Sequence, residues 1–337
     1  MQPKLKRGEL DGLAEFYSLD SRRTETMLEL AEARPSRAEA IHFFANCLRI
    51  GGVLSLASAL VFFVAANWGR FAVVGRFALV EIALVGCTAV AFARPPPEFI
   101  GRGASFLAFI TTGALLALFG QTYQTGADVY ELFLMWALLG LPLVVVAQWS
   151  VASAAWILVL NTALALFCGA HPTGGLLWAA IESRHLRPAL LIISAGMINL
   201  ALWFALEVRP IGAAPDWVRR FILSCAFGFG TWGGVLAVAG GSPGYGESQF
   251  DAASVFLLAI AMAWVGSYTV RRRTDVYPLA VVMGTFIIVS LVWLGRAVEF
   301  RDEGTFLLLA LWLVGTSTAA GAILTSLTRR WRKAADP

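Results

Sequence analysis

Ten apolar runs of about 20 residues follow one another along most of this chain. Because an α-helix rises about 1.5 Å per residue, a run of that length crosses the roughly 30 Å of hydrocarbon in a lipid bilayer. The sequence therefore predicts an all-α fold, a polytopic membrane bundle of about ten transmembrane helices. The expected spans are approximately 48–66, 71–93, 103–120, 129–147, 150–169, 188–206, 218–239, 251–270, 276–295 and 304–327.

The composition excludes a water-soluble domain of this size. Hydrophobic residues make up 58% of the 337 residues, only 14% are charged, and the mean hydropathy is +0.71. Such values imply a surface that contacts lipid, so the bilayer is the first expected partner. The excess of basic residues does not indicate a nucleic-acid partner, because the positive charges lie between the apolar runs.

The fourth and fifth runs meet at Gln148, Trp149 and Ser150 without a charged residue between them. Read as one helix, about 40 residues would extend about 60 Å, which is twice the hydrocarbon thickness. We therefore expect two helices that separate at this point.

The distribution of Lys and Arg predicts the orientation. If the N-terminus is cytoplasmic, 20 of the 26 Lys and Arg residues fall on the cytoplasmic face. This bias agrees with the positive-inside rule, and ten spans return the basic tail 329–337 to the same side. We expect a multi-pass inner-membrane protein with both termini in the cytoplasm.

Residues 1–47 form a predicted cytoplasmic helical segment ahead of the transmembrane domain 48–328. The first residues are charged, so no secretory signal is expected there. Leu10, Leu13, Phe16 and Tyr17 share one helical face, and a second helix is predicted to start at Asp20 and Ser21. Ser36 and Glu39 have the spacing of a capping box, which predicts a further helix start.

The polar residues that look selected gather around an island, 121–128, between the third and fourth spans. In the predicted topology this island and the turn after the first span lie on the same, non-cytoplasmic face. We expect them to form one polar cluster that can bind a ligand. Its candidate members are Asn67, Trp68, Arg76, Glu81, Gln121, Tyr123, Gln124, Asp128 and Glu131.

Each member of this cluster also has a structural interpretation. Asn67 with Trp68 is typical of a helix C-terminus with an interfacial aromatic anchor. Residues 121–124 could line a vestibule or simply solvate a loop. Arg76 and Glu81 lie within the second span, where a charge costs on the order of 3 kcal/mol. Asp128 or Glu131 could pair with Arg76, and Glu81 suits either proton or cation handling or a structural ion pair with an arginine.

Two segments of the sequence resemble a known family. VFFVAANWGRFAVVGRFALVE (61–81) contains an Ala-Asn-Trp turn before a basic second span, and ALFGQTYQTGADVYELFLMWALLGLPL (117–143) contains a Gly-Gln-x-Tyr island before an aromatic, Leu-rich span. Both are similar to the bacterial predicted membrane proteins catalogued as domain of unknown function 2157, with the specific motifs in 48–146. The resemblance implies an integral inner-membrane protein of unassigned function and carries over no catalytic residue. Other membrane-protein subunits are conceivable partners.

The remaining polar and small residues indicate packing. Asn161 and Asn199, alone in their spans, are typical of hydrogen bonding between helices, and Ala226, Gly230 and Gly234 repeat at a spacing of four, which allows close helix contact. The four cysteines and three histidines form no metal or redox motif, so no metal and no cofactor is expected. We expect the cysteines to be buried packing residues.

Three functions remain open. A scaffold or sensor subunit of a membrane complex needs only the polar cluster and the cytoplasmic segment, and is favoured by default. A small-solute or ion transporter would use Arg76 and Glu81, although two ionisable residues within spans are few for a proton-coupled transporter. A membrane-embedded enzyme is least favoured, since the sequence contains no nucleophile, metal cluster or acid–base pair in a recognisable arrangement.

Overall fold

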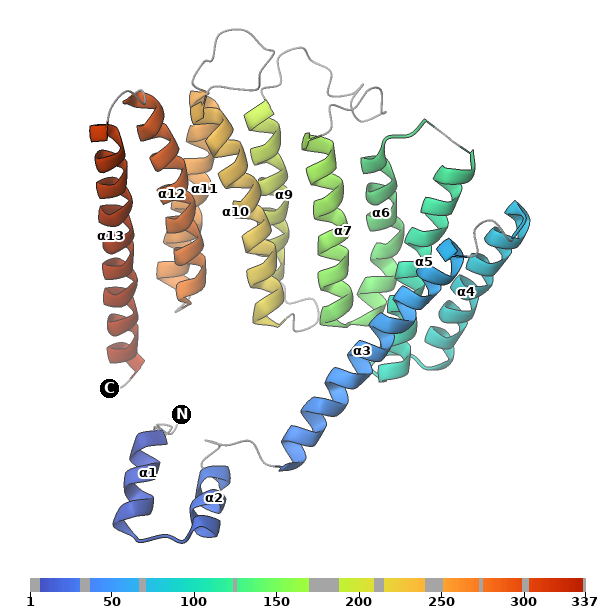
Figure 1. The fold of residues 1–337 in the computed structure, drawn as a ribbon, viewed down its shortest axis with the longest axis horizontal. Coiled ribbons are helices and arrows are strands. Elements are labelled where there is room, and N and C mark those ends of the chain that lie inside the picture. Colours follow the sequence, from blue (N-terminus) through green and yellow to red (C-terminus); the bar gives the residue numbers. More distant parts are fainter. Residues whose placement is uncertain are drawn as a thin grey trace. The chain divides into compact units, whose positions relative to one another are not determined.

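A computed structural model of the chain describes residues 7–30, 37–66, 71–123, 126–169, 188–208, 215–239, 251–272, 275–298 and 303–335. These residues form helices and contain no strand (Figure 1). The helices are α1 (Arg7–Phe16), α2 (Ser21–Leu30), α3 (Arg37–Ala66), α4 (Val73–Ala93), α5 (Phe99–Tyr123), α6 (Val129–Ala147), α7 (Ser150–Gly169), α9 (Pro188–Val208), α10 (Asp216–Ala239), α11 (Ala252–Arg272), α12 (Val276–Ala297) and α13 (Glu303–Ala335). The chain divides into two units, Met1–Ala72 and Val73–Pro337.

Ten of the described helices, α3 to α7 and α9 to α13, are long and apolar enough to cross a membrane. The predicted fold class and the predicted number of membrane-capable helices are therefore confirmed. The break between the fourth and fifth spans lies where length alone required it: Gln148 adopts a left-handed conformation (φ +46°) that ends α6, and α7 begins at Ser150. A left-handed residue at this position commonly terminates a helix.

The first unit begins with a helical hairpin. Asp20 Oδ1 accepts a hydrogen bond from the backbone N–H of Arg22 (3.2 Å), and α2 starts at Ser21, as the sequence predicts. α1 packs against α2, with Leu10 and Leu28 buried, whereas Phe16 and Tyr17 on the predicted apolar face stay exposed. α3 begins at Arg37, where a helix was expected; Ser36 lies outside the described residues.

In the second unit, successive helices run in alternating directions (Figure 1). α5 and α6 interlock through two aromatic side chains that occupy the space above glycines. A Cβ on Gly113 would lie 2.3 Å from the Trp136 ring, and one on Gly140 would lie 2.4 Å from the Phe109 ring. The two rings stack with centroids 5.4 Å apart, and Trp136 Nε1 donates to the Phe109 carbonyl (2.8 Å). Trp136 thus satisfies its polar N–H inside the bundle.

α9 and α10 approach each other closely, because glycines lie at their contact. A Cβ on Gly196 would lie 2.7 Å from the Ala226 carbonyl oxygen, and one on Gly233 would lie 2.9 Å from the Ala189 carbonyl oxygen. Gly230 and Gly234 instead face Leu258 of α11, at 3.0 and 2.6 Å from their ideal Cβ positions. The predicted packing role of the glycines is confirmed, on two faces of α10.

Asn161 of α7 and Asn199 of α9 form a reciprocal amide pair. Asn161 Nδ2 donates to Asn199 Oδ1 (3.0 Å), and Asn199 Nδ2 donates to Asn161 Oδ1 (2.9 Å). Each amide also donates to the carbonyl four residues earlier in its own helix. Asn199 is fully buried, so the prediction of hydrogen bonding between helices is confirmed.

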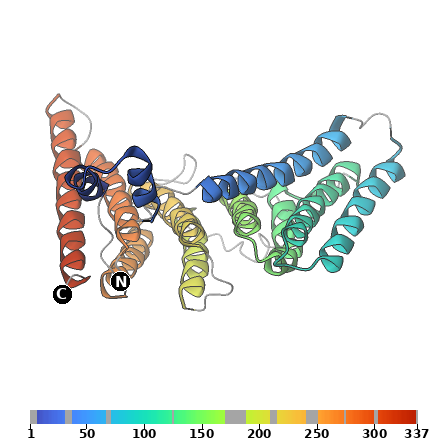
Figure 2. The ribbon, with the colours of Figure 1, turned by 90° about the horizontal axis from the view of Figure 1, so that it is seen from below.

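α4 and α13 are the edge helices of this unit, α4 beside α5 and α13 beside α12 (Figures 1 and 2). Most of their apolar side chains are exposed, as expected for surfaces in a bilayer. The cysteines are free: Cys87, Cys168 and Cys225 are half-buried, and Cys47 is exposed. The prediction of a buried packing role is therefore wrong for Cys47 of α3.

Candidate functional site

The predicted polar cluster falls where α4 begins, α5 ends and α6 begins. The Phe77 and Tyr123 rings lie 6.0 Å apart between centroids, so the first turns of α4 contact the last turn of α5. The Phe119 ring, one turn earlier in α5, lies 4.9 Å from the Tyr123 ring between centroids. Arg76, next to Phe77, is half-buried. These contacts place the start of α4 and the end of α5 at the same end of the second unit (Figure 1).

The last turn of α5 presents polar side chains outward. Gln121 and Tyr123 are exposed, although both belong to a helix whose middle is largely buried. The hydroxyl of Thr122 between them is buried and has no hydrogen-bond partner within the described part of the chain. The end of α5 therefore exposes the side-chain amide of Gln121 and the phenol of Tyr123.

The start of α6 carries two carboxylates. Asp128 is half-buried, and its side chain makes no capping hydrogen bond, although its carbonyl accepts from the Glu131 N–H (3.0 Å). Glu131 Oε1 accepts a hydrogen bond from the buried Tyr130 hydroxyl (3.3 Å). Tyr130 packs edge-on against Phe167 of α7 (5.1 Å). Negative charge is favourable in the first turn of a helix, which explains both carboxylates without a ligand.

Glu81 lies apart from these residues. It is exposed on α4, more than two turns beyond the start of that helix, and makes no hydrogen bond or ion pair with the described residues. The ion pairs shown by the described residues do not include one between Arg76 and Asp128 or Glu131, so that pairing stays a prediction. Asn67, Trp68 and Gln124 lie outside the described residues.

Sequence reasoning missed a second polar group, at the opposite end of the unit (Figure 1). The α9–α12 charged cluster consists of Glu207, Asp216, Arg219, Arg220 and Asp275. Arg219 pairs with Asp216 one turn away, and its Nε lies 3.9 Å from Oε1 of Glu207, whose side chain is only 3% exposed. The arginine therefore balances a buried carboxylate at the end of α9.

Arg220 connects α10 to α12. Its Nη2 donates to both carboxylate oxygens of Asp275 (3.2 and 3.3 Å), and its guanidinium lies 5.3 Å from the centre of the Tyr277 ring. The Tyr277 hydroxyl is 2.5 Å from Ser224 Oγ, and Asp275 Oδ1 caps α12 by accepting from the Tyr277 N–H. Opposite charges compensate each other here, which favours a structural role. Only the three-residue spacing of Asp216 and Arg219 could have indicated the cluster, because Arg220 and Asp275 are 55 residues apart.

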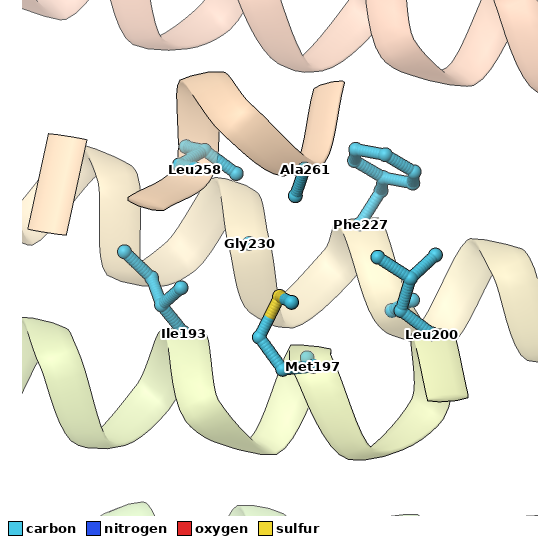
Figure 3. Close-up of a pocket in the computed structure, with 9 residues that line it drawn as sticks. Ile193, Met197, Leu200, Phe227, Gly230, Leu258 and Ala261 are labelled. Atoms are coloured by element: carbon cyan, nitrogen blue, oxygen red, sulfur yellow. The ribbon is translucent and has the colours of Figure 1, made fainter. Parts of the chain in front are cut away.

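The recess between α9, α10 and α11 is small and apolar. Its volume is about 10 Å³, enough for about one water molecule. Figure 3 shows that hydrophobic side chains line it. They include Ile193, Met197, Leu200, Phe227, Leu258 and Ala261. Among the described residues, no group of three or more His, Cys, Asp or Glu could hold a metal ion.

Residues 17–153 match the family model described as Predicted membrane protein (DUF2157). The resemblance expected from the sequence is confirmed for this part of the chain. The DUF2157 segment, 17–153, extends from the end of the N-terminal hairpin's first helix to the start of α7 and includes the candidate site. Searches of curated proteins and of solved structures found no match.

Proposed function

We propose that this protein is a scaffold or sensor subunit of an inner-membrane complex. It acts through the polar side chains at the α4–α6 end of the DUF2157 segment. The observation that carries the proposal is the outward exposure of Gln121 and Tyr123 at the end of α5. Polar side chains that face away from a helical bundle suit recognition of another protein at the membrane surface.

The interior of the second unit supports this proposal over transport. A transporter needs polar groups around a path through the bilayer. In the described residues, Asn161 and Asn199 bond to each other, Thr231 bonds to Thr285 (3.0 Å), and the recess in Figure 3 is apolar. Polar groups that already satisfy one another stabilise a fixed bundle.

The proposed orientation places the α4–α6 end outside and residues 1–47 and 329–337 in the cytoplasm, on either side of the transmembrane domain 48–328. The excess of Lys and Arg on the assigned cytoplasmic side supports it. A reporter enzyme that works only in the cytoplasm should be active when it is fused after Lys333. A tag inserted near Tyr123 should be accessible only from outside the cell membrane. The reverse pattern at either position would overturn the orientation.

Purification from native membranes in mild detergent tests the function. We expect other protein subunits to co-elute with the wild-type chain in a fixed ratio. The double substitution Gln121→Ala and Tyr123→Ala should reduce this co-elution at least about tenfold. Arg271→Gln with Arg272→Gln, which changes exposed side chains at the opposite end, should leave it unchanged. A chain that elutes alone, or with a bound small molecule, would contradict the scaffold and favour a transporter.

A further inference from the structure

One face of α4 is exposed along the whole helix. Its side chains recur at intervals of three or four residues, the spacing of a single helical face. We call this face the α4 stripe. Its principal residues are Val74, Ala78, Glu81, Ile82, Val85 and Phe92. Val74 and Phe92, near the two ends of the helix, are 79% and 83% exposed, and no described residue of the second unit covers the stripe at either end. α3 of the first unit has no Lys or Arg between Ile50 and Ala66, so its apolar part offers no basic side chain to a carboxylate on the stripe.

Glu81 is the charged residue of this otherwise apolar stripe. It lies eight residues beyond Val73, which corresponds to about 12 Å of helix rise. The span Val73–Ala93 has 21 residues, so Glu81 lies near its middle. A carboxylate at that depth costs about 3 kcal/mol on insertion scales when it faces lipid, and such residues normally contact protein or water. The stripe is therefore a surface that protein should cover.

We propose that the α4 stripe binds a transmembrane helix of a second, different membrane protein, and that this helix places a Lys or Arg side chain opposite Glu81. The inference rests on the proposed scaffold function and names the chemistry of the partner. An ion pair within the bilayer compensates both charges.

Charge and symmetry argue against a second copy of this chain. Copies in one membrane share the same orientation, and a two-fold axis along the membrane normal brings residues of equal depth together. Two copies joined through the α4 stripe would therefore place Glu81 against Glu81, and like charges repel. Arg76 of the second copy lies five residues nearer the membrane surface, about 7 Å, and about 140° around the helix, so it does not face Glu81.

α13 provides the comparison surface. It is also an edge helix with exposed apolar side chains, among them Phe306, Leu307, Leu311 and Val314. No charged residue occurs between Gly304 and Thr328. Nothing on α13 requires protein contact, and acyl chains suffice to cover it.

Site-specific photo-crosslinking in native membranes tests the inference. A benzophenone amino acid at Ile82 or Val85 should form an adduct with one protein, whose crosslinked transmembrane helix contains Lys or Arg. The same probe at Leu307 or Leu311 of α13 should label lipid only. Glu81→Leu should reduce the Val85 adduct about tenfold, and Glu81→Gln should reduce it less. Glu81→Lys should abolish it, and exchange of the partner's basic residue for Glu should restore it.

The contradicting outcomes are distinct. An adduct with a second copy, an adduct confined to one chain, or labelling of lipid alone at Val85 would each overturn the inference. So would an adduct that survives Glu81→Lys. If subunits still co-elute with the wild-type chain in these cases, the scaffold proposal stands and only the Glu81 contact fails. If nothing co-elutes, both fail.

Discussion

The α4–α6 region and the α9–α12 region use their polar side chains in different ways. In α9–α12, side chains from separate helices bond to one another: Ser224 with Tyr277, Thr231 with Thr285, and Arg220 with Asp275. In α4–α6, Trp136 bonds across to the Phe109 carbonyl of α5, but Thr88, Thr111 and Thr112 bond to carbonyls of their own helices. Glu81, Gln121 and Tyr123 are exposed. Polar side chains join helices more often in the first region, and the second region leaves more of its polar groups exposed.

The difference matters because lipid offers no hydrogen bonds. A polar group in the hydrocarbon must find a partner within its own chain, in another protein or in water. Among the described residues, the α9–α12 region satisfies most of its polar groups internally. The α4–α6 region, which belongs to the DUF2157 segment, satisfies them only in part. We infer that the first region stabilises the fold and that the second provides the contacts with a partner.

The largest expected effect is that of a bulky residue at the α9–α10 contact. Gly233→Val would place a Cβ 2.6 Å from Ile193 Cγ1 and 2.9 Å from the Ala189 carbonyl oxygen. We expect a loss of stability of about 1–3 kcal/mol, seen as a lower Tm of the detergent-solubilised protein. Gly228→Val is the matched control, because a Cβ on Gly228 of the same helix meets nothing within 4 Å. Equal losses for the two variants would contradict the described packing.

A smaller loss is expected when the amide pair is broken. Asn199→Leu leaves the Asn161 amide without its partner on α9 and should lower stability by about 1 kcal/mol. The double variant Asn161→Leu and Asn199→Leu should lose less than the sum of the two single variants, because neither amide is then left unpaired. The same Tm measurement checks this. Strict additivity would mean that the two amides do not interact.

The smallest expected effect concerns the α9–α12 charged cluster. The Arg220 side chain is 47% exposed, so solvent screens its pair with Asp275. Arg220→Gln should lower stability by less than about 1 kcal/mol, and this loss should shrink in high salt. Arg272→Gln, at the exposed end of α11, is the control and should have no measurable effect. A loss for Arg220→Gln larger than that of Asn199→Leu would show that the cluster dominates the stability of this region.

The elements of the fold were predictable because they depend on local properties of the sequence. Run length and hydropathy gave the ten spans, and length alone required the break at Gln148. The contacts between helices were harder to predict from the sequence. Asn161 and Asn199 were expected to bond across helices because a lone amide in a span needs a partner. Nothing in the sequence pattern joins Arg220 to Asp275, 55 residues away.

The sequence showed which residues of the candidate site are polar, but it did not show which way their side chains face. Polar residues in apolar surroundings were visible at Glu81 and at 121–128 in the sequence. The exposed face of α4 was not, because apolar residues occur on all sides of a membrane helix and give little periodicity. Only the packing of α4 against α5 shows that Glu81 faces away from the helices of its unit.

The contrast between the α4–α6 and α9–α12 regions is tested most directly with one variant in each region, by measuring both stability and co-elution. For Glu81→Leu and for Asn199→Leu, the Tm of the isolated chain and the amount of co-eluting subunit are measured side by side. We predict that Glu81→Leu keeps the wild-type Tm and loses the subunit, whereas Asn199→Leu lowers the Tm. If Glu81→Leu lowers the Tm as much as Asn199→Leu and leaves co-elution unchanged, Glu81 has its partner within the chain, and the assignment of the two regions is wrong.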